Sequence, residues 1–158
     1  MHDFSRAHPA FRNCGQTVVM RERVGAIIER DGLILMVRHR AKDSSGRHVG
    51  NDYLTLPGGG IEDGETPTDA VAREVAEEVN LHVTHSSFLR RIEHREREHP
   101  GATSLFRVAV ADGEPWLGSD PELTCDCPRL VGLEWIPAPR RAEWLGEAAW
   151  AHLKVRLS

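Results

Sequence analysis

Hydrophobic residues fall in several short runs along the chain. Residues 24–28 and 33–37 are nearly continuous hydrophobic runs on either side of Asp31-Gly32. Two such runs around an Asp-Gly turn predict a β-hairpin, and their unbroken hydrophobicity predicts strands covered on both faces. Four further strands are predicted at 53–56, 81–92, 104–110 and 130–136, and residues 93–101 predict a charged hairpin tip.

Two segments instead repeat hydrophobic residues at helical spacing. The first covers residues 67–79. The second runs from 140 to 157 and predicts a C-terminal amphipathic helix. Helices on a mixed β-sheet predict an α/β layered domain. The 158 residues fit one domain. We expect residues 1–22 to form an N-terminal extension or edge strand and residues 23–158 to form that single domain.

The helix at 67–79 has signals at both ends. Thr66 is a good N-cap, and Pro67 suits the first helical position. Asp69 lies three residues after the cap, where it can complete a capping-box-like pair and favour the positive end of the helix. Asn80 tolerates the left-handed conformation that ends many helices. We therefore expect a helix from Pro67 to Val79.

Three glutamates share one side of this helix. At about 100° per residue, Glu74, Glu77 and Glu78 lie within an arc of about 100°. Glu78 falls at the edge of the stripe that packs on the core, whereas Ala70 lies on the acidic face and leaves it open. The stripe consists of Val71, Ala72, Val75 and Val79.

Like charges at this spacing repel one another, and partial burial increases the repulsion. Arg73 offsets part of this charge, but one arginine does not neutralise three carboxylates. A hard divalent cation such as Mg²⁺ or Mn²⁺ would. A solvated acidic face with an ordinary Arg–Glu pair is the alternative. Gly58, Gly59 and Gly60 favour the metal site, because they let the backbone approach a metal or a phosphate closely.

The residues around this helix resemble the Nudix box, the signature of Nudix hydrolases. The matching positions, preceded by Leu56-Pro57-Gly58, are Gly59, Glu65, Arg73, Glu74, Glu77, Glu78 and Leu81. One position departs, because Asn80 stands where the family usually has glycine. Asparagine can adopt the same backbone conformation, so we expect the turn to survive at a small cost in stability. The resemblance implies a Nudix-like α/β/α sandwich with a mixed β-sheet.

The resemblance also implies an activity. Nudix hydrolases split nucleoside diphosphates linked to another group X, using Mg²⁺ or Mn²⁺ and attack of water at phosphorus. The metal ligands would be Glu74, Glu77, Glu78 and a carbonyl of Gly59, while Arg73 and Glu65 would orient the glutamates. The general base is left open between Glu74 or Glu77 and an acid outside the box, for which Glu122, Asp126 and Glu134 are the candidates.

Other residues suggest contacts with the substrate. Arg38 and Arg40 end a predicted strand beside a polar loop and could hold phosphates, although exposed arginines are common at strand ends. Tyr53, Phe106 and Trp116 could stack on a base. The first two are better explained as packing residues, and Trp116 is left undecided.

Composition excludes several classes of protein. The net charge of −4 does not favour a stable complex with nucleic acid, so a small nucleotide-type substrate is expected. The chain has no long hydrophobic run for a membrane span and no apolar segment near its start for a signal peptide, so we expect a cytoplasmic enzyme. Three cysteines make no disulfide framework. A catalytically silent nucleotide-binding module is the alternative function, and the resemblance leaves a homodimer open.

Overall fold

The computed structural model describes residues 20–94, 100–118, 129–138 and 154–156. These residues form one helix and eight strands, with side chains described for all of them except the last strand. In chain order the elements are β1 (Arg21–Ile27), β2 (Glu29–Arg30), β3 (Leu33–His39), β4 (Tyr53–Thr55), α1 (Pro67–Val79), β5 (Val83–His94), β6 (Gly101–Val110), β7 (Leu130–Pro137) and β8 (Lys154–Arg156).

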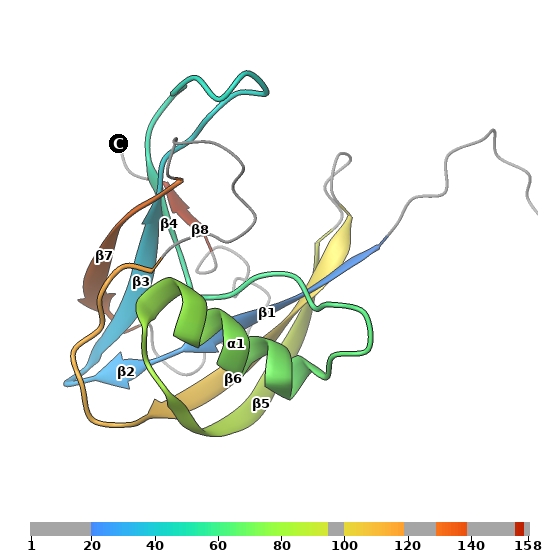
Figure 1. The fold of residues 1–158 in the computed structure, drawn as a ribbon, viewed down its shortest axis with the longest axis vertical. Coiled ribbons are helices and arrows are strands. Elements are labelled where there is room, and N and C mark those ends of the chain that lie inside the picture. Colours follow the sequence, from blue (N-terminus) through green and yellow to red (C-terminus); the bar gives the residue numbers. More distant parts are fainter. Residues whose placement is uncertain (1–19, 95–99, 119–128, 139–153, 157–158) are drawn as a thin grey trace, which may run out of the picture.

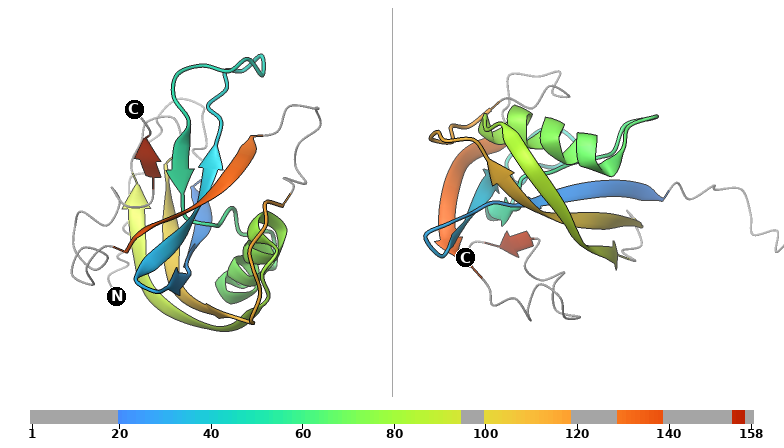
Figure 2. Two further views of the ribbon diagram at one scale, coloured as in Figure 1. Left: turned by 90° about the vertical axis from the view of Figure 1, so that its left-hand side faces the viewer. Right: turned by 90° about the horizontal axis from the view of Figure 1, so that it is seen from below.

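The strands form two sheets (Figure 1). One has the order β1-β6-β5, with β1 parallel to β6 and β6 antiparallel to β5. The other has the order β2-β3-β4-β8, with β7 also paired to β3, and its described pairs are antiparallel. The helix α1 packs against β1 and β5 (Figure 2). The predicted α/β fold with a mixed β-sheet is therefore confirmed.

The turn at Asp31-Gly32 forms as predicted, but one strand of its hairpin differs. Both residues have positive φ, 52° and 76°, as an Asp-Gly hairpin turn requires. The turn joins β3 to the short β2, whereas the hydrophobic run in β1 pairs in parallel with β6 in the other sheet. The prediction that residues 24–28 pair with 33–37 is thus wrong for residues 24–27, whereas Ile28 O does accept a hydrogen bond from Leu35 N (3.0 Å). A run that is hydrophobic on both faces does not specify its partner, and β6 offers β1 a pairing along its whole length.

Two hydrophobic clusters fill the interior. The first lies against α1, and it combines the helix residues Ala70, Val71, Val75 and Val79 with Val24, Ala26, Ile28, Leu35, Val37, Leu81, Phe106, Val108 and Leu130. The second comprises Ile27, Ile34, Met36, Leu54, Leu56, Ile92 and Leu105. Neighbouring residues of β1 and β3 enter different clusters, so both strands are covered on both faces, as their sequences predict.

Strands β4, β5, β6 and β7 lie close to their predicted positions, and β5 and β6 form the predicted antiparallel hairpin. The C-terminal helix is wrong over Lys154–Arg156, which form β8 and pair with Tyr53–Thr55. Spacing along the chain cannot reveal a pairing with a strand about a hundred residues away. The rest of that predicted helix, like residues 1–19, lies outside the described residues. Within the described parts of the chain, no helix has the length and hydrophobicity needed to cross a membrane.

Candidate active site

The ends of α1 have the predicted capping structure. The Thr66 hydroxyl accepts a hydrogen bond from the Asp69 backbone N (3.1 Å) and donates one to Asp69 Oδ2 (2.7 Å). Pro67 is the first helical residue. Asn80 ends the helix in the left-handed conformation, with φ 54° and ψ 38°. Local sequence therefore determines both ends of the helix that carries the glutamates.

One face of α1 is buried more widely than predicted. Ala70, expected on an open acidic face, is fully buried together with Val71, Val75 and Val79, whereas Ala72 is only half-buried. The buried arc thus includes the positions of Glu74 and Glu78. The helical projection misses this, because it does not contain the strand and the glycine loop that pack against this side of the helix. Glu74 therefore lies against the protein, with 12% of its side chain exposed, whereas Glu77 stays 34% exposed.

The glycine loop before the helix is fastened to β1. The backbone N of Val24 donates to Gly59 O (2.9 Å), and that of Ala26 donates to Pro57 O (2.8 Å). Gly58 N in turn donates to Glu78 Oε2 (3.0 Å). A Cβ on Gly59 would fall 2.5 Å from the carboxyl carbon of Glu74, well inside contact distance. The loop therefore forms a cradle for Glu74 and Glu78, in which any side chain at position 59 would displace the Glu74 carboxylate.

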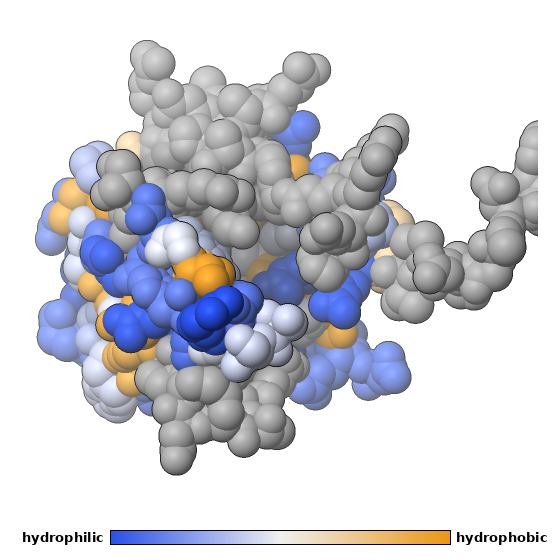
Figure 3. All heavy atoms as spheres, turned by 90° about the horizontal axis from the view of Figure 1, so that it is seen from above, coloured by the Kyte–Doolittle hydropathy of each residue, from blue (hydrophilic) through white to orange (hydrophobic). Residues whose placement is uncertain are grey.

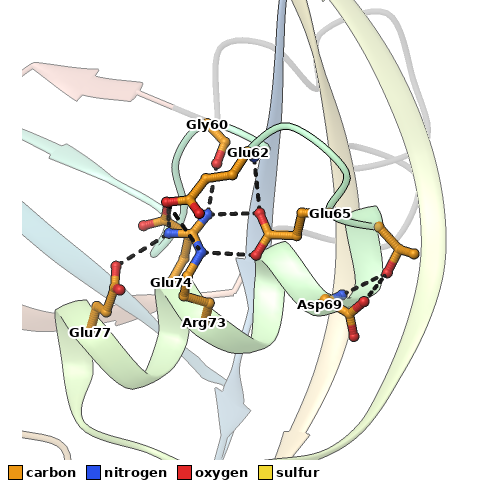
Figure 4. A network of polar contacts seen from close by, with 8 residues as sticks. Gly60, Glu62, Glu65, Asp69, Arg73, Glu74 and Glu77 are labelled. Carbon is orange, nitrogen blue, oxygen red and sulfur yellow. Dashed lines mark hydrogen bonds and ion pairs between the residues drawn. The ribbon is translucent and has the colours of Figure 1, made fainter.

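Arg73 uses all of its donors within this site (Figure 4). Its Nε and Nη2 donate to the two oxygens of Glu65 (2.9 and 3.0 Å), and Nη2 also donates to Gly60 O (2.9 Å). Its Nη1 donates to Glu74 Oε1 (3.0 Å) and Glu77 Oε2 (3.3 Å). A guanidinium has five N–H donors, so these five contacts leave none for a substrate. This geometry suits the supporting role expected of Arg73 and Glu65.

The electrostatics of the site centre on Glu74. Burial raises the pKa of the Glu74 carboxyl; hydrogen bonding to Arg73 opposes this shift, and the charge of Glu77 adds to it. The pKa of Glu65 is lowered, chiefly by its hydrogen bond to Arg73, and the same pairing raises the pKa of Arg73. The buried Glu74 carboxylate is thus costly to ionise, and one saturated arginine only partly offsets that cost. A bound cation would lower it further.

The donor set suits a hard divalent cation, because the three glutamates offer carboxylate oxygens, the ligands such ions prefer. Gly59 O, predicted as a ligand, accepts the hydrogen bond from Val24 N. Among the described residues, no three His, Cys, Asp or Glu side chains already converge on one point. Glu74 and Glu77 turn towards Arg73 instead, so metal binding would require them to turn away from it.

The other predicted contacts lie elsewhere or are paired. Arg38 forms an ion pair with Glu134, one of the candidates for a base outside the box. Arg40 is exposed at the start of the loop between β3 and β4. Seen from above, the described surface of the protein is mainly hydrophilic (Figure 3). Glu122 and Asp126 lie outside the described residues.

The three aromatic candidates have different surroundings. Phe106 is buried in the core, as the packing interpretation predicts. Tyr53 stacks on His39, with ring centroids 5.1 Å apart, and the His39 ring lies 2.7 Å from the Thr55 hydroxyl. Trp116 is 63% exposed. Sequence reasoning missed His39 as part of this group, because only strand pairing brings it opposite Tyr53.

Arg23 is a second residue that sequence reasoning missed. It forms an isolated bridge with Gly60 at the edge of the glycine loop, and its charge lowers the pKa of Glu74, although this is the smallest of the contributions. Its place just before a hydrophobic run is no signal of a site. Only the docking of β1 beside the loop brings this cation to the glutamates.

Known proteins resemble this chain over most of its length. The family model described as NUDIX domain matches residues 19–150. An 8-oxo-dGTP diphosphatase of Escherichia coli (strain K12) is 36% identical over 90 residues, which are 57% of this chain and 67% of that protein. The "Putative 8-oxo-dGTP diphosphatase 2" of Mycobacterium tuberculosis (strain ATCC 25618 / H37Rv) is 32% identical over 129 residues, 79% of this chain and 84% of that protein. The crystal structure of a MutT NUDIX hydrolase from Burkholderia pseudomallei matches with a TM-score of 0.62 and 25% identity, covering 85% of this chain and 96% of that one.

Proposed function

This chain belongs to the Nudix family and is a pyrophosphohydrolase of that type, and on this premise we propose that it is a metal-dependent enzyme acting on nucleoside diphosphates linked to a group X. Water attacks one phosphorus, and the phosphoanhydride bond breaks. Nucleoside triphosphates are included, since their γ-phosphate is one such group X on a nucleoside diphosphate. The ion would be Mg²⁺ or Mn²⁺, held by Glu74, Glu77, Glu78 and the backbone at Gly59.

The observation that carries this proposal is the enclosure of Glu74. Its side chain is only 12% exposed, lies against Gly59, and accepts a hydrogen bond from Arg73 Nη1 (3.0 Å). A buried carboxylate beside two other acids is unfavourable unless a cation joins them. A bound divalent ion supplies charge neutralisation for the phosphates and lowers the pKa of its water.

The residues of the chain have separate tasks in this proposal. Gly58 N holds the Glu78 carboxylate through Oε2 (3.0 Å). Arg73, with its donors saturated, fixes Glu65 and sets the resting positions of Glu74 and Glu77. Of the two box candidates for the general base, Glu77 is the more exposed, at 34% against 12% for Glu74. We therefore assign Glu77 the proton of the attacking water.

Similar proteins suggest which substrate to test first. Two relatives that resemble this chain are named 8-oxo-dGTP diphosphatases, one of them putatively. We propose a nucleoside triphosphate with a modified purine as the preferred substrate, with cleavage to the monophosphate and pyrophosphate. A cytoplasmic location and the homodimer stay predictions.

The test is a hydrolysis panel with Mg²⁺ or Mn²⁺, covering 8-oxo-dGTP, normal dNTPs, ADP-ribose, NDP-sugars and dinucleoside polyphosphates. We expect metal-dependent turnover that Glu78→Gln abolishes while its thermal melt stays near that of the wild type. Glu62→Gln is the matched control, because Glu62 is an exposed acid at the edge of the same network, 4.0 Å from Arg73 Nε. An absence of turnover on every member, with tight nucleotide binding, would instead favour the silent binding module.

A further inference from the structure

A segment after β6 crosses the C-terminal end of α1 (Figure 2). We call residues 112–118 the strap. Trp116 N donates to Val79 O (3.2 Å), and Gly118 N donates to Glu78 O (2.8 Å). A Cβ on Gly118 would fall 2.7 Å from the carbonyl carbon of Glu77, so the strap backbone lies directly on the last turn of the helix. The strap thus occupies the end of the helix that carries the glutamates.

Asn80 adds a side-chain link between the helix and the strap. Its φ of 54° is in the left-handed region, which glycine enters at lower energy. Its Nδ2 donates to the carbonyl O of Trp116 (3.0 Å), a hydrogen bond that glycine could not make. The residue that ends the helix therefore also fixes the backbone of Trp116.

The other end of the strap is held by Arg30. Its Nη2 donates to Gly113 O (2.8 Å), and its Nη1 pairs with Glu114 Oε1 (3.0 Å). Leu117 is partly buried against the core cluster beneath α1. The backbone of the strap is thus anchored on both sides of Trp116, whose indole is left 63% exposed. A large hydrophobic ring is held outside the core on a fixed backbone.

We propose that Trp116 stacks on the nucleobase of the substrate and that Asn80 is the positioning residue that holds it there. This inference rests on the proposed function. Every nucleobase has a flat π-face, and an indole offers the largest aromatic surface among side chains for it. From Glu74 to Val79 the helix rises only about 7.5 Å. Phosphates at the glutamates and a base at the strap are therefore within the span of one nucleotide.

Steady-state kinetics on the substrate found in the panel test the stacking. Trp116→Ala should raise KM roughly ten- to a hundredfold with kcat nearly unchanged, and Trp116→Phe should raise it less because a ring is kept. Asp112→Asn is the matched control, since Asp112 is an exposed strap residue that takes no part in the anchoring described above. An unchanged KM in Trp116→Ala, with hydrolysis intact, would overturn the stacking while leaving the proposed function in place.

A binding measurement separates the two proposals if no turnover is found. Guanosine 5′-monophosphate should quench the tryptophan fluorescence of the full chain, ribose 5-phosphate should not, and Trp116→Phe should lose the response. Equal responses to both probes, or a quench that survives in Trp116→Phe, would contradict a role for this ring.

Asn80→Gly tests the positioning role, because glycine keeps the left-handed turn and removes only the amide. We expect KM to rise about fivefold, the value for one lost hydrogen bond. In the Trp116→Ala background the same change should have no further effect on KM, since Asn80 would act only through Trp116. An equal effect of Asn80→Gly in both backgrounds would show a merely structural role and refute the coupling.

Discussion

Replacing Gly59 with alanine tests whether the close approach of the loop to Glu74 matters for catalysis. The new Cβ would lie 2.5 Å from the carboxyl carbon of Glu74. Carbon atoms pack at about 3.5–4.0 Å, so the carboxylate must withdraw by about 1 Å. This movement would weaken its 3.0 Å hydrogen bond to Arg73 Nη1 and carry it away from the proposed metal position.

The expected effect is large on activity and small on stability. A catalytic group displaced by about 1 Å can cost roughly a hundredfold in rate, so we expect kcat/KM to fall by about that factor. The overlap involves the end of a flexible side chain, which can turn aside. We therefore expect a stability loss near the lower end of the range for overpacking, about 1 kcal/mol. In a chain of this size this corresponds to a Tm lower by about 2–4 °C.

Gly60→Ala is the matched control, since a Cβ on Gly60 would meet nothing within 4 Å. Both variants should be compared by initial rates with saturating Mg²⁺, by thermal melts, and by the shift in Tm that Mn²⁺ produces. Gly60→Ala should keep its kcat/KM within about twofold of wild type, with a Tm equal or slightly higher because alanine restricts the unfolded chain. Equal activity in the two variants would refute the cradle, and a Tm loss far above the expected range in Gly59→Ala would show disruption of the loop.

Three further predictions concern the charged network. A lysine at position 73 has three N–H donors for the five acceptors that Arg73 contacts, so Arg73→Lys should lower the free energy of unfolding by about 1–3 kcal/mol in urea titrations. An unchanged unfolding midpoint would show that the five contacts of Arg73 do not stabilise the protein. Burial raises the pKa of Glu74, so its ionisation destabilises the native state as pH rises through that pKa. With EDTA present, the Tm of Glu74→Gln at pH 7 should therefore be equal to or higher than that of the wild type. Any gain in Tm should vanish below pH 4.5, the ordinary pKa of a glutamate. A Tm clearly lower than that of the wild type at pH 7 would contradict this. Because the pKa of Glu65 is lowered, its carboxylate stabilises the native state above pH 4.5, and this stabilisation is lost as the pH falls. Glu65→Gln should therefore lower the Tm at pH 7 but not in acid. A decrease in Tm that is the same at every pH would contradict this.

Sequence alone determined the helix that carries the glutamates. Thr66, Pro67 and Asn80 specify its ends through contacts within a few residues, so those signals can be recognised along the chain. The spacing of Glu74, Glu77 and Glu78 follows from helical geometry in the same way. The turn at Asp31-Gly32 is likewise a local choice of backbone conformation. Each of these features forms in the structure where the sequence predicts it.

Tertiary structure decided the features that depend on distant partners. The hydrophobic run in β1 pairs with β6, and Lys154–Arg156 pair with β4, because a strand has donors and acceptors for any edge that burial brings to it. Docking of β1 and the glycine loop buries Ala70 and encloses Glu74. That enclosure saturates Arg73 and raises the pKa of Glu74, so it turns a face that a solvent-exposed helix could carry into a candidate active site. The glutamates can be identified from sequence, whereas their burial is a property of the packed protein.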